Sequence, residues 1–281
     1  MINNSKTINM KHAVITGSSS GIGLGLAKEF LKKGFSVTIS GRNIEKLNQA
    51  TDKLMKEFSA EKISKKKCDV RSSSDIENLW NFAFERFGKV NIWVNNAGVG
   101  QDYIYIKDFN EEPVNQLIDI NIKGVINASR IVFNAMEDQD FGAIYNMEGF
   151  GSDGRKMQKL SIYGTTKSAV RYFTQSFIKE TKDSSVIIGT VSPGMVLTDL
   201  YLKPSYENEA EAKRFLNITN ILADKVETVT PWLVSKMISN TVHGKSFNWL
   251  NSSKIFFRFL SSLVRKRHLI SESEIKIKRT V

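Results

Sequence analysis

Cysteine and histidine are scarce in this sequence. Cys68 is the only cysteine, so no disulfide can form within the chain, and the three histidines are scattered too widely to suggest a zinc site. We therefore expect neither a disulfide-stabilised fold nor a metal site. A chain of this kind suits a reducing, cytoplasmic environment.

Long apolar runs are also missing. No uninterrupted stretch approaches the roughly 20 apolar residues that a membrane-spanning helix needs. The first residues, MINNSKTINMKH, lack the apolar core of a signal peptide. We therefore expect a protein that neither crosses a membrane nor carries an export signal.

The composition that remains is typical of a folded globular protein: 281 residues, 41% hydrophobic and 25% charged. There is no internal repeat or linker, so we expect a single domain over residues 1–281. The formal net charge is +11, and residues 254–281 carry eight Lys or Arg against two Glu. A basic end of this kind can bind nucleic acid or an anionic membrane, or simply be solvated. Because the excess is local, we do not expect nucleic-acid binding.

Apolar segments of strand length alternate with helix-period segments from residue 12 to about 191. This alternation predicts an α/β fold with a doubly wound parallel sheet of the Rossmann type, covered by helices on both faces. The expected strands are His12–Thr16, Ser36–Ser40, Lys62–Cys68, Asn91–Asn95, Ala143–Met147 and Val186–Val191. The first helix places Ile22, Leu26, Phe30 and Leu31 on one face and stops at Gly34.

Three later helices are expected. The first begins near residue 165 and places Val170, Phe173 and Phe177 on a buried stripe. A charged helix covers about residues 206–220, and another opens near Thr230-Pro231, where proline suits the first turn. We divide the domain into a cofactor-binding and catalytic core, residues 11–200, and a substrate loop with a C-terminal basic segment, residues 201–281.

A glycine-rich turn, Thr16-Gly17-Ser18-Ser19-Ser20-Gly21-Ile22-Gly23, joins the first strand to the first helix. Gly17 permits a tight turn, Gly21 lets the backbone approach a pyrophosphate, and Gly23 lets helix and strand pack closely. The helix N-terminus offers free N–H groups to the same anion. The turn predicts a dinucleotide site, with an ordinary strand-to-helix connection as the alternative.

Tyr163 and Lys167 are four residues apart on an expected helix, so their side chains project from the same face. A free tyrosine has a pKa of about 10, and a neighbouring ammonium together with a positive nicotinamide ring would favour the phenolate and lower that pKa. Such a tyrosine can exchange a proton with a carbonyl or alcohol oxygen while a nicotinamide handles the hydride. The alternative is an ordinary buried aromatic beside a surface charge.

Four motifs in this order resemble the short-chain dehydrogenases/reductases: TGSSSGIG, Asn95-Asn96-Ala97-Gly98, Tyr163-Gly164-Thr165-Thr166-Lys167 and Ser192-Pro193-Gly194. The resemblance covers about residues 11–200. It implies an NAD(P)H-dependent oxidoreductase that forms homodimers or homotetramers through helices around 113–138 and 161–182.

The resemblance also implies the site residues. Asn121 would order a water that links Lys167 to solvent, unless it is a satisfied buried amide. Asp69 would lie at the adenine, although it could equally cap a helix. The expected cofactor contacts are Gly17, Ser19, Ser20, Gly21, Ile22, Gly23, Arg42, Asp69, Val70, Asn95, Ala97, Gly98, Tyr163, Lys167, Pro193, Gly194, Val196 and Thr198.

Cofactor choice depends on the end of the second strand, Ser40-Gly41-Arg42, which carries no acid. An acidic side chain there would hold the ribose hydroxyls of NAD, whereas Arg42 can pair with the extra phosphate of NADP. We expect NADP(H) to be preferred and NAD(H) to be usable. Alternatively, Arg42 is a surface residue that opens the next helix.

The serine that the family places after the fifth strand is absent. The segment Glu148-Gly149-Phe150-Gly151-Ser152-Asp153-Gly154 follows that strand instead. Ser152 is the nearest hydroxyl that could polarise a carbonyl, with a plain loop serine as the alternative. Ser161 would more naturally cap the next helix.

The segment that departs from the family pattern resembles that of one branch, the chlorophyll(ide) b reductases, which reduce a formyl group of a tetrapyrrole with NADPH. The resemblance rests on NMEGFGSDGRKMQKLSIYGTTKSAV, SPGMVLTDL and KIFFRFL. It implies a bacterial-type reductase of a bulky apolar aldehyde or ketone. The alternatives are a dehydrogenase of a small alcohol, sugar or hydroxyacyl group, and a nicotinamide-sensing protein without catalysis.

Apolar residues at 256, 259, 260, 263 and 264 follow helical spacing in the C-terminal segment. This face could pack on the domain as a lid or subunit contact. Alternatively, it could insert shallowly into an anionic membrane surface, beside the cluster Arg265, Lys266 and Arg267.

Overall fold

The computed structural model describes residues 11–202, 205–206, 208–271 and 276–277. The first ten residues, where we expect no signal peptide, lie outside the described residues. So do Lys278 and Arg279, which belong to the basic end of the chain.

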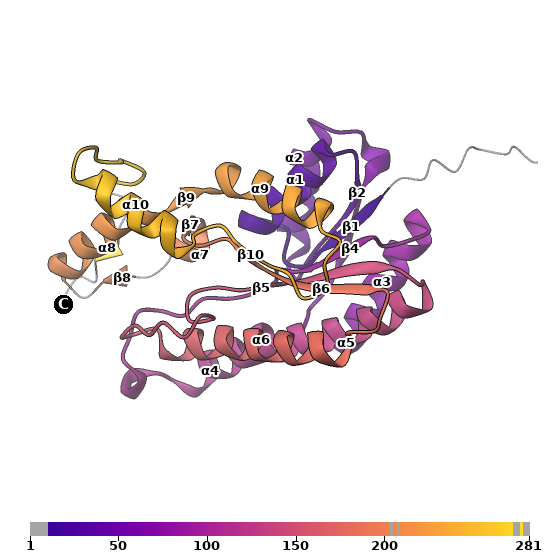
Figure 1. The fold of residues 1–281 in the computed structure, drawn as a ribbon, viewed down its shortest axis with the longest axis horizontal. Helices are drawn as coiled ribbons and strands as arrows, with labels where there is room; N and C mark the ends of the chain where they lie inside the picture. The colour runs from indigo at the N-terminus through magenta and orange to yellow at the C-terminus, as the bar shows by residue number, and fades with distance from the viewer. Residues whose placement is uncertain (1–10, 203–204, 207, 272–275, 278–281) are drawn as a thin grey trace, which may run out of the picture.

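A parallel sheet of seven strands forms the middle layer, in the order β3-β2-β1-β4-β5-β6-β10 (Figure 1). Its strands are β1 (His12–Ile15), β2 (Ser36–Gly41), β3 (Ile63–Lys67), β4 (Ile92–Asn95), β5 (Gly142–Met147), β6 (Val186–Ser192) and β10 (Ser246–Asn248). The first six confirm the predicted strands. The strand order reverses between β1 and β4, and in sheets of this type ligands bind beside the carboxyl ends of the strands at that point.

Helices cover both faces of the sheet, as predicted (Figure 1). One face carries α1 (Gly21–Lys32), α2 (Ile44–Met55) and α9 (Val226–Ser239). The other carries α3 (Ser73–Phe87), α5 (Gly124–Asp138) and α6 (Ser161–Glu180). A short helix α4 (Glu111–Ile118) leads into α5 through a single π-helical stretch, η3 (Asp119–Lys123).

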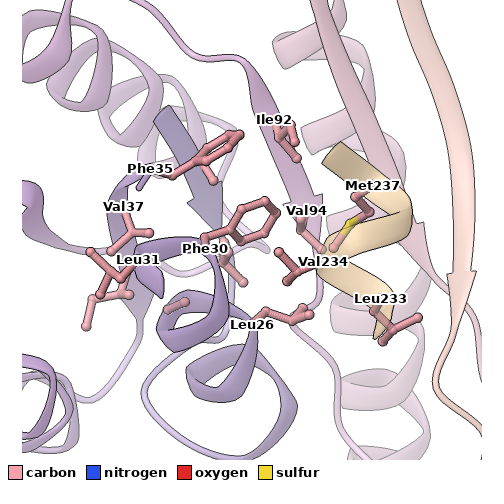
Figure 2. Packing of buried hydrophobic residues seen from close by; sticks show 14 of the residues in the cluster. Leu26, Phe30, Leu31, Phe35, Val37, Ile92, Val94, Leu233, Val234 and Met237 are labelled. Carbon is pink, nitrogen blue, oxygen red and sulfur yellow. The ribbon is translucent and has the colours of Figure 1, made fainter. Parts of the chain in front are cut away.

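The core under α1 and α9 confirms the predicted apolar stripe of the first helix. Leu26 and Phe30 of α1 and Leu233 of α9 are completely buried against Val94 of β4 (Figure 2). The helix stops where expected, because Gly34 takes a left-handed φ of +85° that other residues rarely adopt. Burying each of these side chains contributes about 1.5–3 kcal/mol to folding.

Two helix starts differ from the prediction. Helix α9 begins at Val226, directly after β9, so Pro231 lies in its second turn rather than its first. Helix α6 begins at Ser161 instead of near residue 165, after an N-cap at Leu160 that makes no side-chain hydrogen bond. Ser161 is therefore the first helical residue and not the cap.

Helices α7, α8 and α10, which follow β6 in the chain, lie together at one end of the molecule, on the left of Figure 1. The charged helix predicted over 206–220 is α8, two to three residues later. The remaining elements are β7 (Val196–Leu197), α7 (Asp199–Leu202), β8 (Ser205–Tyr206), α8 (Glu209–Leu222), β9 (Asp224–Lys225), α10 (Ser252–Ser262), β11 (Lys276–Ile277), η1 (Ala60–Lys62) and η2 (Ile106–Asp108).

Candidate active site

The glycine-rich turn after β1 is held in place by the segment that follows β4. Asn96 Nδ2 donates hydrogen bonds to the carbonyl oxygens of Thr16 (2.9 Å) and Gly17 (3.0 Å). A Cβ atom added to Gly17, whose φ is +61°, would lie 2.7 Å from Ala97 Cα. One added to Gly23 would lie 2.5 Å from Asn96 Nδ2. Both glycines are therefore required by packing, as predicted for Gly23.

The N-terminus of α1 has the features of an anion site. Its N-cap, Ser20, has an extended backbone and makes no side-chain capping hydrogen bond, so the first-turn amides remain available to an oxyanion. A Cβ atom added to Gly21 would lie 3.3 Å from Thr198 Cγ2. Ser19 Oγ would lie 3.3 Å from a Cβ on Gly41, at the end of β2. Ile22 packs against the core.

Arg42 is exposed and stands just before Asn43, the N-cap of α2. The Asp69 carboxylate accepts a 2.6 Å hydrogen bond from Arg71 Nη2, which lowers the pKa of Asp69. The cap of α3 is Ser72, so the reading of Asp69 as a helix cap is wrong. Arg71 escaped the sequence analysis, because nothing in its spacing shows that it turns back onto Asp69.

Tyr163 and Lys167 project together from α6, as predicted. Lys167 Nζ donates to the carbonyl of Met147 at 3.1 Å and lies 5.9 Å from the centre of the Tyr163 ring. A Cβ added to Gly149 would lie 2.6 Å from Tyr163 Oη. The tyrosine hydroxyl therefore lies over Gly149, in space that only a glycine leaves open.

Burial dominates the protonation of this pair. In the protein alone it raises the pKa of Tyr163 to about 12; the lowering that we expect from the ammonium and a positive nicotinamide ring together stays a prediction. Burial also lowers the pKa of Lys167 to about 8, against the opposing effect of the Glu148 carboxylate. At neutral pH the protein alone holds Tyr163 as a phenol and Lys167 mostly as an ammonium.

Asn121 lies in the π-helical stretch η3 and is completely buried. Its Oδ1 accepts from Val99 N at 2.8 Å, and its Nδ2 donates to Val99 O at 2.9 Å and to Thr166 Oγ1 at 3.2 Å. A Cβ on Gly98 would lie 3.3 Å from Asn121 Oδ1 and 3.8 Å from Lys167 Nζ. Asn121 is a satisfied amide that lies close to the lysine, and its water-ordering role stays a prediction.

Ser152 faces its own loop. Its Oγ donates to the carbonyl of Gly149 at 2.6 Å and accepts from the Gly149 amide at 3.0 Å. The side chain therefore fixes the peptide groups beneath Tyr163. Polarisation of a substrate carbonyl by Ser152 stays a prediction.

Asn95 points into the core. Its Nδ2 donates to Asn146 Oδ1 (2.8 Å) and Ser129 Oγ (3.1 Å), and its Oδ1 accepts from Trp93 Nε1. This buried network joins β4, β5 and α5. The Asn95 side chain is therefore engaged within the protein, and only the chain after it can line the site.

Four further predicted contacts separate into two groups. Gly194 has a φ of +72° in the turn, and Thr198 lies beside Gly21. Val196 is buried in the core, as is Val70, which packs on Gly124. Both valine side chains are therefore part of the hydrophobic core.

An aromatic cluster near Tyr163 was not predicted. Tyr206 lies 5.7 Å from Tyr103 and 4.8 Å from Phe215 between ring centres, and Tyr201 lies 5.3 Å from Phe215. The Tyr206 hydroxyl is buried, with no hydrogen-bond partner among the described residues. Tyr103 lies far in sequence from the other three rings, so no local pattern could reveal that it joins them.

Gln101 lies in the segment between β4 and α4 and connects that segment to helix α6. Its Oε1 accepts from the Tyr163 amide at 2.5 Å, and its Nε2 donates to Lys159 O at 2.7 Å.

In the described part of the chain, no group of three or more His, Cys, Asp or Glu could hold a metal ion. Within those same residues, no helix is long and apolar enough to cross a membrane.

Comparisons with known proteins match this geometry. A sequence profile described as short chain dehydrogenase matches residues 11–209. The chain is 33% identical over 278 residues to the probable chlorophyll(ide) b reductase NYC1, chloroplastic, of Oryza sativa subsp. japonica, covering 93% of this chain and 54% of that protein. It is 37% identical over 228 residues to the chlorophyll(ide) b reductase NOL, chloroplastic, of the same plant, covering 79% and 65%. The chain thus spans between 54% and 65% of the length of these relatives.

Solved structures agree on the fold. A variant of actinorhodin polyketide ketoreductase with NADPH superimposes with a TM-score of 0.75 at 25% identity, covering 86% of this chain and 96% of that one. ElxO with NADP bound gives the same score and identity, with coverage of 88% and 99%.

Proposed function

Because this chain belongs to the short-chain dehydrogenase family, we propose that it is an NADPH-dependent reductase of a bulky, apolar aldehyde or ketone, with Tyr163 as proton donor. One observation carries the proposal: the Tyr163 phenol lies over Gly149, one helical turn from Lys167. The family membership makes it an oxidoreductase, and the nicotinamide-bound solved structures support this class of cofactor.

The chain's own residues would handle the proton. A reduced nicotinamide, when bound, would supply the hydride for the carbonyl carbon. Tyr163, kept as a phenol by its raised pKa, gives its proton to the carbonyl oxygen, so that the product is an alcohol. Lys167, held by the Met147 carbonyl, stabilises the tyrosinate until a proton returns, and Asn121 would order the water on that route. Ser152 fixes the Gly149 peptide beside the reacting oxygen.

The cofactor site fits a dinucleotide phosphate. The uncapped start of α1 and the crowded glycines leave a backbone-lined place for a pyrophosphate. Arg42, exposed at the end of β2, would hold the extra phosphate of NADP, while Asp69 is already paired with Arg71.

Arg42→Asp should therefore reverse the preference from NADPH towards NADH. The lost charge-assisted hydrogen bond is worth roughly 1.5–3 kcal/mol, or about 10-fold to 150-fold in NADPH affinity. Binding of each cofactor can be followed by nicotinamide fluorescence, with Lys46→Gln in α2 as a control. A wild-type protein that already prefers NADH would contradict the role of Arg42.

The substrate class rests on the aromatic cluster and on the relatives. Tyr103, which is partly exposed and lies near Tyr163, would offer a flat apolar surface, backed by the buried ring of Tyr206. The relatives named chlorophyll(ide) b reductases support a formyl-tetrapyrrole as the first substrate to test.

Tyr163→Phe tests the mechanism. We expect turnover of a panel of aldehydes and ketones, including formyl-tetrapyrroles, to fall by about 10²–10⁴-fold with NADPH binding retained. NADPH absorbance reports the rate. The matched control is Tyr172→Phe, an exposed tyrosine on the same helix. Near-normal activity of Tyr163→Phe would refute the assignment, and a wild type that binds NADPH without any turnover would favour the nicotinamide-sensing alternative.

A further inference from the structure

Helix α10 turns its apolar face to solvent and a mainly polar face towards the domain. The partly buried residues of the helix are Lys254, Ile255, Arg258 and Ser262, which share one helical face turned towards the domain. The exposed large apolar residues on and just after the helix are Phe256, Phe257, Phe259, Leu260, Leu263 (82% exposed) and Val264 (93% exposed). The interpretation in which this apolar face packs on the domain is therefore wrong.

Polar contacts fix this orientation. Arg258 Nη2 lies 2.7 Å from an Asp224 oxygen, and Arg258 Nη1 donates to the carbonyl of Leu222 at 2.6 Å. Arg267 bonds to Asp224 at 2.9 Å and to the carbonyl of Ile221 at 2.9 Å. Two arginines thus satisfy the C-terminal carbonyls of α8 and a buried carboxylate, so the outward direction of the apolar face is built into the fold. Arg267, which we expected to face lipid, is used here instead.

The surrounding sequence is entirely of one charge sign. Residues 228–271 contain no Asp or Glu. They contain seven basic residues: Lys236, Lys245, Lys254, Arg258, Arg265, Lys266 and Arg267. Arg265 and Lys266 are exposed and follow directly after the apolar Leu263 and Val264.

We propose that α10 and residues 263–266 form a docking surface for an anionic lipid bilayer. The apolar side chains would enter the boundary between headgroups and acyl chains, while Arg265 and Lys266 pair with the headgroups. A second copy of the chain fits less well, because a twofold interface through this face would place the basic groups of both copies near one another. The surface lies beside α8, at the end of the molecule that holds the aromatic cluster (Figure 1).

Vesicle sedimentation tests the proposal on the full chain. We expect binding to phosphatidylcholine vesicles that contain phosphatidylglycerol, and neither binding to pure phosphatidylcholine nor retention in high salt. Arg265→Gln with Lys266→Gln should weaken binding on the order of 30-fold, since each basic residue near such a surface changes partition about fivefold. Leu263→Gln with Val264→Gln should also weaken it. The matched control is Lys53→Gln with Lys56→Gln on the exposed face of α2.

Several results would overturn the proposal: no binding to anionic vesicles, equal binding to both vesicle types, or equal losses in the α2 control. A change in oligomeric state caused by Leu263→Gln with Val264→Gln would assign this face to a second copy instead. The far-UV circular dichroism spectrum and the midpoint of thermal unfolding serve as the folding check for every variant, and both should be unchanged. The outcome is thus independent of the proposed catalytic role of Tyr163.

Discussion

Glu148 is a buried carboxylate whose charge acts on Lys167. It precedes Gly149, and its Oε2 lies 3.7 Å from Arg171 Nη1. Burial raises its pKa, while the charges of Arg171 and Lys167 oppose that rise. Its own charge raises the pKa of Lys167, so Glu148 helps keep the lysine an ammonium.

Glu148→Gln should move the alkaline limb of the pH–rate profile to lower pH. Without the carboxylate, the pKa of Lys167 falls below its value of about 8, and the ammonium is lost earlier as the pH rises. The profile of kcat between pH 6 and 10 measures this shift, with Glu45→Gln on exposed α2 as the control. An unmoved limb would mean that Glu148 only supports the loop.

At the residue scale, local spacing predicts part of the site. Tyr163 and Lys167 are one helical turn apart, so their shared face follows from the sequence alone. The direction of Asn95 does not, because it depends on pairing with Asn146 in another strand. The inward turn of Ser152 likewise depends on a loop geometry that glycines leave undetermined.

Strand β1 carries a buried polar side chain. His12 is completely buried, with its ring nitrogens 2.9 Å from Lys89 O and 2.8 Å from Thr38 Oγ1. Burial lowers the pKa of His12 from 6.5 to about 4. The histidine is therefore neutral in the folded protein at neutral pH.

The free energy of unfolding should fall as the pH drops from about 6.5 to 4. In that window the unfolded chain protonates His12 while the folded protein does not, which removes about 3 kcal/mol of stability. Urea denaturation at several pH values measures the effect. His12→Gln should flatten this part of the curve, whereas exposed His268→Gln should leave it unchanged. Equal slopes in all three proteins would disprove the role of His12.

At the element scale, periodicity predicts what is long and buried. The first six strands are apolar runs, and α1 has a regular stripe, so both were predictable. Strand β10 is three residues long, with Ser246 and Asn248 exposed, and carries no such signal. The start of α9 depends on the pairing of β9 with β7, which joins residues far apart in sequence.

At the scale of the whole molecule, α4 and α6 contact one another and expose apolar side chains. Ile118 is 43% exposed and Tyr172 is 76% exposed. These helices lie in the regions that the family resemblance assigns to subunit contacts. We therefore expect a dimer or tetramer through this layer.

Tyr172→Glu should dissociate that assembly. At a twofold contact the new carboxylate of one subunit is buried close to the same carboxylate of the other subunit, and the two repel one another. Analytical ultracentrifugation should give a multiple of 31.7 kDa for the wild type and a smaller mass for the variant. The matched control is Met55→Glu, which places the same charge on an exposed apolar residue of α2. A monomeric wild type would contradict the expectation.

The sheet order has a consequence for protein synthesis. Because β1 lies between β2 and β4, the ribosome releases the strands from the centre of the sheet outward, first to one edge and then to the other. Strands β1 to β3 are complete once Lys67 has emerged, while the other edge of β1 awaits β4. Strands β1 to β3 and the glycine-rich turn thus leave the ribosome before α6 with Tyr163, and helix α10 emerges only after the entire sheet.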